Sequence, residues 1–107
     1  MIIDLAKREP VRSDEYRAFV RSLPCCGCGV TPAGHAHHCI SDRHAARKAS
    51  DTACMPLCPI CHSALHSGWR EWEAANNTQW FHVARTIERA AQLGVLVINV
   101  EMARAAA

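Results

Sequence analysis

Two sets of metal-binding residue types are interleaved between residues 25 and 66 of the chain. The first set is four thiols in two Cys-x-x-Cys motifs, Cys25/Cys28 and Cys58/Cys61. Four thiolates in two such pairs favour a tetrahedral structural zinc ion. The spacer between the pairs is longer than the roughly 15–20 residues of a compact zinc ribbon. It is therefore long enough to enclose a hairpin.

Three further cysteines bring the total to seven. Cys26 is an alternative ligand to Cys25, because Cys26 and Cys28 are also closely spaced, but a two-residue spacer suits a single metal better. We interpret Cys26, Cys39 and Cys54 as small buried hydrophobic residues. An odd number of cysteines, with Cys-x-x-Cys pairs among them, favours metal thiolates in a reducing compartment over a disulfide framework.

The second set is imidazoles, and five of the seven histidines fall in residues 35–38 and 62–66. His62 and His66 are four residues apart, so on a helix they project from one face and can share an ion. His37 and His38 follow His35, which stands at strand spacing from His37. A metal ion can neutralise a phosphodiester while a nearby imidazole of near-neutral pKa activates water. Adjacent strand residues point to opposite faces, so this use of His37 and His38 requires a strand end or a local distortion.

A basic cluster, Arg43, Arg47 and Lys48, lies between the two halves of these sets. It can contact the phosphates of DNA, or it can be an ordinary solvated loop. The net charge of +2 is too small to identify a nucleic-acid-binding protein by itself. We interpret His44 and His82 as ordinary surface or helix histidines.

Local signals predict the elements that must position these residues. The capping hydroxyl of Ser13 and a proline at the first helical position, Pro59, start two helices, and Pro24 ends the first. In chain order we expect a helix from Ser13 to Pro24, a turn-rich knuckle over 25–34, a strand over 36–40, a polar loop over 41–52, a strand over 53–57 and a helix from Pro59 to Gly68.

A further helical segment is expected to follow the metal-binding region. Trp69 and Trp72 are predicted to form one turn before Asn76 and Asn77 interrupt the helical pattern. Thr78 then caps a longer helix that Gly94 closes. We expect its packing face to consist of Trp80, Ala84, Ile87 and Ala91, and we expect a strand over 95–100 and a frayed tail over 101–107.

The length of 107 residues corresponds to a single domain, residues 1–107. No apolar run approaches the ~18 residues that a membrane helix needs. The N-terminus lacks the basic start and the long apolar stretch of a secretory signal. We therefore expect an α+β domain with no membrane partner, located in the cytoplasm.

Three runs of residues resemble HNH endonucleases, and they look closest to the small phage-type branch that includes the recombination-enhancement nucleases. They are Leu23-Pro24-Cys25-Cys26-Gly27-Cys28-Gly29, Ala36-His37-His38, and Pro56-Leu57-Cys58-Pro59-Ile60-Cys61-His62-Ser63-Ala64-Leu65-His66. The resemblance covers roughly residues 13–82. It implies a ββα-metal core, treble-clef-like, with a four-cysteine zinc knuckle and flanking helices. It also implies a metal-dependent DNA endonuclease in a bacterial or phage-infected cell, leaving 5′-phosphate and 3′-hydroxyl ends.

The resemblance also implies roles for the histidines. His38 matches the general base, while His37, His62 and His66 match ligands of one catalytic divalent cation (Mn²⁺, Ni²⁺, Co²⁺ or Mg²⁺). His35 falls where some members carry an acidic residue. The departure from the pattern is Ala53, which stands where the family has an asparagine, and Asp51 is the nearest polar residue that can replace it.

Two other function classes fit part of the pattern. One is a non-catalytic zinc module that binds nucleic acid or another protein, in which His62 and His66 only support the fold. The other is a thiol redox protein, but both Cys-x-x-Cys motifs lack the βαβ context of that chemistry. The sequence does not specify an interface between copies of the chain.

Overall fold

The computed structural model describes residues 10–40, 49–97 and 99. The expected DNA-contacting residues Arg43, Arg47 and Lys48 lie outside the described residues, as does the tail over 101–107. The described part is a small α+β fold with four α-helices and a two-stranded sheet. Its elements are α1 (Asp14–Ser22), β1 (His35–His38), the 3₁₀ helix η2 (Asp51–Ala53), β2 (Cys54–Leu57), α2 (Pro59–Ser67), α3 (Trp69–Asn76) and α4 (Gln79–Gln92).

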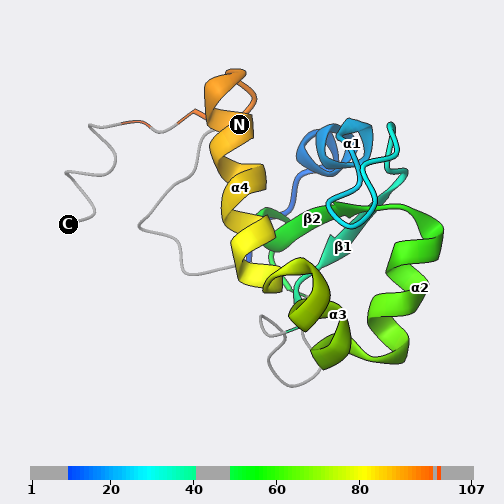
Figure 1. The fold of residues 1–107 in the computed structure, drawn as a ribbon. Helices are drawn as coiled ribbons and strands as arrows, with labels where there is room; N and C mark the ends of the chain where they lie inside the picture. Colours follow the sequence, from blue (N-terminus) through cyan, green and yellow to red (C-terminus); the bar gives the residue numbers. More distant parts are fainter. Residues whose placement is uncertain (1–9, 41–48, 98, 100–107) are drawn as a thin grey trace.

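The two strands form an antiparallel pair at the centre of the fold, with α1, α2 and α4 arranged around it (Figure 1). His35 lies opposite Leu57, and His38 lies opposite Cys54. The second strand leads directly through Cys58 into α2. Strand, strand and helix therefore follow one another as expected, with each strand overlapping its predicted range.

Local sequence signals explain where the helices begin. The Ser13 hydroxyl accepts a hydrogen bond from the Tyr16 N–H at the start of α1, and the Thr78 hydroxyl accepts one from the Phe81 N–H at the start of α4. These bonds satisfy backbone donors that have no partner within the helix. Pro59 occupies the first turn of α2, where its missing N–H costs nothing.

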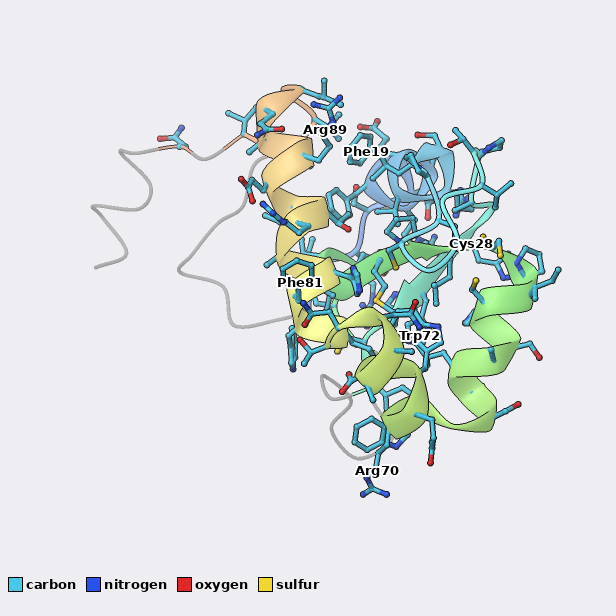
Figure 2. All side chains as sticks on the ribbon, in the orientation of Figure 1. Phe19, Cys28, Arg70, Trp72, Phe81 and Arg89 are labelled. Atoms are coloured by element: carbon cyan, nitrogen blue, oxygen red, sulfur yellow. The ribbon has the colours of Figure 1, made fainter. Side chains whose placement is uncertain are left out.

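The buried residues form two clusters on the sheet. Tyr16 and Val20 of α1 pack with Cys54, while Met55 and Leu57 pack with residues of α2, α3 and α4. Trp72 belongs to the second cluster and lies inside the fold, whereas Arg70 on the same helix projects outward (Figure 2). The sheet is therefore covered on more than one side by helices.

Three of the predicted helices and strands need correction. The segment after Gly68 is a full helix, α3, rather than one turn. The most buried face of α4 is one residue out of phase with the prediction and consists of Gln79, Val83, Thr86 and Ala90, which leaves Trp80 47% exposed. Of the predicted residues, Ile87 is partly buried and packs against both core clusters. Within the expected strand over 95–100, the described residues 95–97 and 99 show only a single bridge position, at Val97.

The predicted loop over 41–52 also differs in its described portion, because η2 begins at Asp51. This turn of helix places Asp51 directly before β2, where only 3% of its surface is exposed. None of the helices in the described ranges combines the length and the apolar character that spanning a bilayer requires.

Candidate metal centres

The four cysteines of the two Cys-x-x-Cys motifs come together in space. One ligand atom from each of Cys25, Cys28, Cys58 and Cys61 lies within 4.8 Å of the others. The Sγ atoms of Cys28 and Cys58 are 3.7 Å apart, which joins the knuckle to the start of α2. Sulfur atoms gather around Cys28 at this end of α2 in Figure 2. This donor set fits a tetrahedral zinc ion.

Backbone N–H groups point at two of these sulfur atoms. The Cys58 Sγ accepts from the Cys61 N–H at the N-terminus of α2, and the Cys25 Sγ accepts from the Gly27 N–H, each at 3.4 Å. Burial alone would raise the pKa of Cys25, but hydrogen bonds from backbone N–H groups lower it to about 6. Burial and the neighbouring thiols instead raise the pKa of Cys61. The four groups therefore need a cation before all of them can be thiolates.

Gly27 lies so close to this site that a side chain does not fit. A Cβ atom built at Gly27 would be 2.9 Å from the Cys61 Sγ and 3.3 Å from the Cys61 Cβ. Close approach of the knuckle backbone, rather than an unusual φ angle, is what requires glycine here. Gly29 is the contrasting case, since its φ is +83° and nothing lies within 4 Å of its Cβ position.

Gly27→Ala is therefore expected to weaken zinc binding and to destabilise the fold by about 1–3 kcal/mol, the usual cost of overpacking. Gly29→Ala serves as the control, because it strains the backbone by about 1–2 kcal/mol without touching a ligand. Competition with a chromogenic chelator measures zinc affinity, and denaturant unfolding measures stability. Equal zinc affinities in the two variants would contradict the close-approach explanation.

A second group consists of three histidines, two of them on α2. Ligand atoms of His37, His62 and His66 lie within 4.8 Å of one another. The His62 Nε2 is 3.1 Å from the His37 Nδ1 and 3.2 Å from the His66 Nε2. Burial, together with the charges of His66 and His35, lowers the pKa of His62, which favours the neutral ring that can donate a lone pair.

The outer nitrogen of His37 is held by α4. Its Nε2 lies 2.9 Å from the Gln79 Oε1, and the same oxygen accepts the Ile40 N–H at 3.2 Å. Because that atom accepts a backbone hydrogen, it is the amide oxygen, and the His37 Nε2 must carry the proton. A neutral His37 then presents a lone pair at Nδ1 toward the His62 Nε2. Nitrogen atoms that converge in this way suit a shared cation.

His35 lies beside the same group. Its Nδ1 is 2.9 Å from the His62 Nδ1, the nitrogen on the far side of the ring from His37. His35 and His37 are on the same side of β1 because they are two residues apart on a strand. His35 is therefore a neighbour of the His62 ring and not a member of the three-nitrogen group.

His38 occupies a different environment, on the opposite side of β1 from His37. Its Nε2 is 2.9 Å from the Asp51 Oδ1, and its side chain is 11% exposed. A carboxylate only accepts hydrogen bonds, so Nε2 carries a proton, and in the neutral ring Nδ1 holds the lone pair. The structure thus brings together His37, His62 and His66 but pairs His38 with Asp51.

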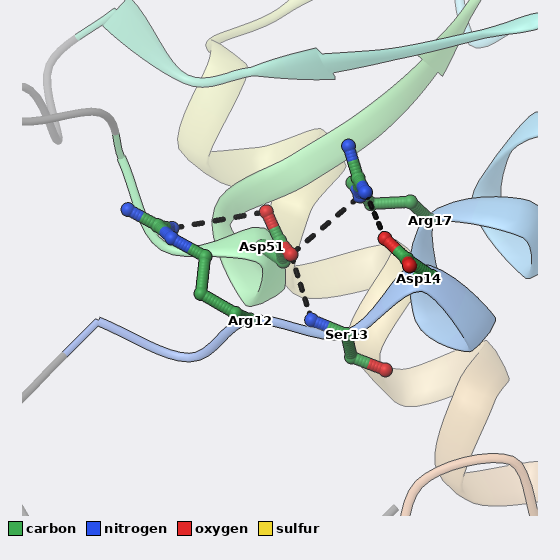
Figure 3. A pocket seen from close by; sticks show the side chains of 5 residues that line it. All are labelled: Arg12, Ser13, Asp14, Arg17 and Asp51. Atoms are coloured by element: carbon green, nitrogen blue, oxygen red, sulfur yellow. Dashed lines mark hydrogen bonds and ion pairs between the residues drawn. The ribbon is translucent and has the colours of Figure 1, made fainter.

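Asp51 is fixed by three groups from the start of α1 (Figure 3). Its Oδ2 accepts the Ser13 N–H at 2.7 Å, and its oxygens lie 3.8 Å from the Arg12 Nη1 and 3.6 Å from the Arg17 Nε. Burial alone would raise the pKa of Asp51, but the hydrogen bonds from His38 and the Ser13 N–H and the charge of Arg17 outweigh it and lower that pKa.

These contacts distinguish two possible roles of Asp51, as a metal ligand or as the residue that orients the His38 ring. A ligand atom of Cys54 also lies within 4.8 Å of those of His38 and Asp51. A cation there would compete with Arg12 and Arg17 for the carboxylate, which disfavours a metal. A cavity of about 280 Å³ opens beside Asp51, and its lining adds Asp14, so the positive and negative side chains balance. The contacts therefore support the second role, in which Asp51 orients the His38 ring.

Sequence reasoning missed three residues of these sites. Gln79, Arg12 and Arg17 touch His37 or Asp51 from elements that are distant in the chain. No spacing signal marks them. The burial of Gln79, which is 1% exposed, is visible only in the structure.

Comparisons with known proteins identify the family of the chain. Residues 1–94 match the model of a family described as "Protein of unknown function (DUF968)". The chain belongs to this family. The chain is also similar to "Uncharacterized protein YdfU" of Escherichia coli (strain K12), to which it is 34% identical over 94 residues that cover 86% of this chain and 27% of that protein. The chain thus spans about a quarter of the length of that relative. No solved structure matches the chain.

Proposed function

We propose that this DUF968 chain is a metal-dependent DNA endonuclease of the HNH type, with a ββα-metal core built from β1, β2 and α2. The observation that supports the proposal most strongly is the convergence of His37, His62 and His66 between a hairpin strand and the following helix. The nitrogens of His37 and His66 lie 3.1 and 3.2 Å from the His62 Nε2. In the proposed mechanism these residues hold a divalent cation.

The three nitrogens fit such an ion by their chemistry. The Gln79 contact sets the proton of His37 on Nε2, which turns the Nδ1 lone pair toward the group. A divalent cation held there would neutralise the scissile phosphate and the departing 3′ oxygen. The four-cysteine site is separate, and its role is to fix the knuckle to the start of α2.

His38 serves as the general base in the proposed mechanism. Its Nδ1 lone pair accepts a proton from water, while Nε2–H donates to Asp51 and keeps the ring in that tautomer. The negative charge of Asp51 stabilises the imidazolium that results. His37 and His38 are the last two residues of β1, so the proposed mechanism requires a phosphodiester that is bound at this strand end and reaches both rings from the two sides of the strand.

The choice of cation tests the composition of the site. Three neutral nitrogens without a carboxylate favour borderline transition metals over magnesium, which prefers oxygen ligands. We therefore expect the zinc-loaded protein to nick supercoiled plasmid faster with Mn²⁺, Co²⁺ or Ni²⁺ than with Mg²⁺ at equal concentration. Asp51→Asn should slow the reaction with every ion without changing their order, because Asp51 faces His38 rather than the three histidines.

Two results would contradict this proposal. Magnesium activity that equals manganese activity would mean that the site contains oxygen ligands. No nicking with any ion at high protein concentration would favour the alternative function, a non-catalytic zinc module that binds nucleic acid or protein. The observation that favours this alternative is the position of His38, which lies on the opposite side of β1 from His37 and so faces away from the three-histidine group.

A further inference from the structure

Gln79 is a polar residue at a buried position of α4, where packing alone would favour an apolar side chain. It is 1% exposed and begins α4 on the face that otherwise buries Val83, Thr86 and Ala90. Its Nε2 is buried without a hydrogen-bond partner among the described residues. A buried amide nitrogen without a hydrogen-bond partner has an energetic cost. An apolar side chain would avoid this cost, so the residue needs another reason to be polar.

The contacts of the other amide atom supply that reason. The Gln79 Oε1 faces both the Nε2 of His37, at 2.9 Å, and the backbone N–H of Ile40, at 3.2 Å. One oxygen thus holds the ring of His37 and the backbone three residues further along the chain. It fixes the orientation of the ring and the nitrogen that carries the proton, and it leaves Nδ1 as the lone pair that faces His62.

The junction between α3 and α4 holds Gln79 in place. Its backbone N–H donates to the Glu73 carboxylate at 2.9 Å, and Thr78 caps the helix immediately before it. Asn77, with φ of 77°, turns the chain between the two helices and accepts the Thr78 N–H on its own Oδ1 at 2.7 Å. The amide oxygen is therefore presented from a fixed helix end.

We infer that Gln79 is a positioning residue of the histidine cation site, which selects the Nε2–H tautomer of His37 so that Nδ1 can ligate. The inference rests on the proposed function, because it assigns a role toward the cation of that function. Groups that orient metal-binding histidines typically contribute about 10–100-fold to metal affinity. Gln79 is thus expected to act through His37 without touching the ion.

Two substitutions separate this role from packing. Gln79→Met keeps the length of the side chain but removes the acceptor, whereas Gln79→Glu keeps an oxygen in the same place. In the zinc-loaded protein, Gln79→Met is expected to lower the affinity for Ni²⁺ about 10–100-fold, and Gln79→Glu should restore most of it. Gln92→Met, at the exposed other end of α4, is the matched control and should bind Ni²⁺ like the wild type. Calorimetry measures the affinity, and metal analysis verifies that the thiolate zinc is retained.

A second measurement needs no added ion. Long-range ¹H–¹⁵N correlation spectra of the zinc-loaded protein report which nitrogen of each histidine is protonated. We expect His37 to be Nε2–H in the wild type and in Gln79→Glu, and to populate Nδ1–H in Gln79→Met. An Nδ1–H tautomer in the wild type, or unchanged Ni²⁺ affinity in Gln79→Met, would overturn the inference. A wild type that shows the Nε2–H tautomer but binds no Ni²⁺ would instead overturn the cation site of the proposed function.

Discussion

Cys61→Ser is expected to lose the zinc ion and most of the tertiary structure. Cys61 is one of four ligands within 4.8 Å of one another, and the site joins the knuckle to the helix that carries His62 and His66. Zinc binding at structural sites is worth about 10–16 kcal/mol, whereas a small domain is stable by only about 5–15 kcal/mol. Loss of one thiolate therefore removes a large share of the folding free energy. Metal content per chain and near-ultraviolet circular dichroism measure the two effects.

Cys26→Ser is the matched control for this experiment. Cys26 lies in the same knuckle but outside the four-cysteine group. Its backbone N–H donates to the Pro56 carbonyl oxygen at 2.9 Å, and its partly buried side chain packs against the core. Burial raises the pKa of its thiol to about 12, so it stays protonated and is a poor ligand. This variant should keep its zinc and its fold. A cooperatively folded, zinc-free Cys61→Ser protein would show that the fold does not depend on the metal.

The elements that the sequence predicted well have local causes. Ser13 and Thr78 form capping hydrogen bonds within three residues, and Pro59 acts within its own turn of helix. The four cysteines meet because each pair is held by a two-residue spacer and the hairpin between the pairs returns the chain. His62 and His66 meet because they are one helical turn apart.

The predictions that failed depended on packing between distant segments. The apolar pattern of α4 allows two neighbouring faces, and contact with β2 and η2 selects the one with Gln79 and Val83 over the one with Trp80. Val95 and Leu96 have strand-like composition, but no neighbouring strand pairs with them in the described residues, and Leu96 packs with Tyr16 and Val20 instead. A segment with high β-propensity forms a strand only where a neighbouring strand pairs with it.

The candidate site likewise contains residues that the sequence predicted and residues that only the structure revealed. The residue types and their spacing in the sequence pointed to His37, His62 and His66, and the pairing of β1 with β2 brings His37 close to the two histidines of α2. The groups that fix the protons of the histidines were not predictable, because Gln79 and Asp51 reach His37 and His38 across the tertiary structure. The sequence indicates Asp51 as a replacement for the asparagine of the HNH pattern, but its contacts with Arg12 and Arg17 are visible only in the structure.

His38→Gln is expected to lower the nicking rate about 10²–10⁴-fold, the contribution usual for a general base. The substitution is chosen because the glutamine amide nitrogen can replace the His38 Nε2 as the donor to Asp51, so the buried carboxylate keeps its partner. Zinc content, thermal stability and DNA binding should then remain close to those of the wild type. His38→Ala should lose activity to the same extent but also lose stability, since it leaves Asp51 without that hydrogen bond.

His82→Gln provides the control for replacing a histidine by glutamine. The His82 Nε2 donates to the Asn76 carbonyl oxygen, which a glutamine amide can also do. This variant should nick DNA at nearly the wild-type rate. If His38→Gln nicked DNA nearly as fast as His82→Gln, His38 would not be the general base. The contacts of Asp51 with Arg12 and Arg17 would then serve only to link α1 to the two strands. If only His38→Ala were inactive and also unstable, the loss would reflect the hydrogen bond that Asp51 loses rather than the missing base.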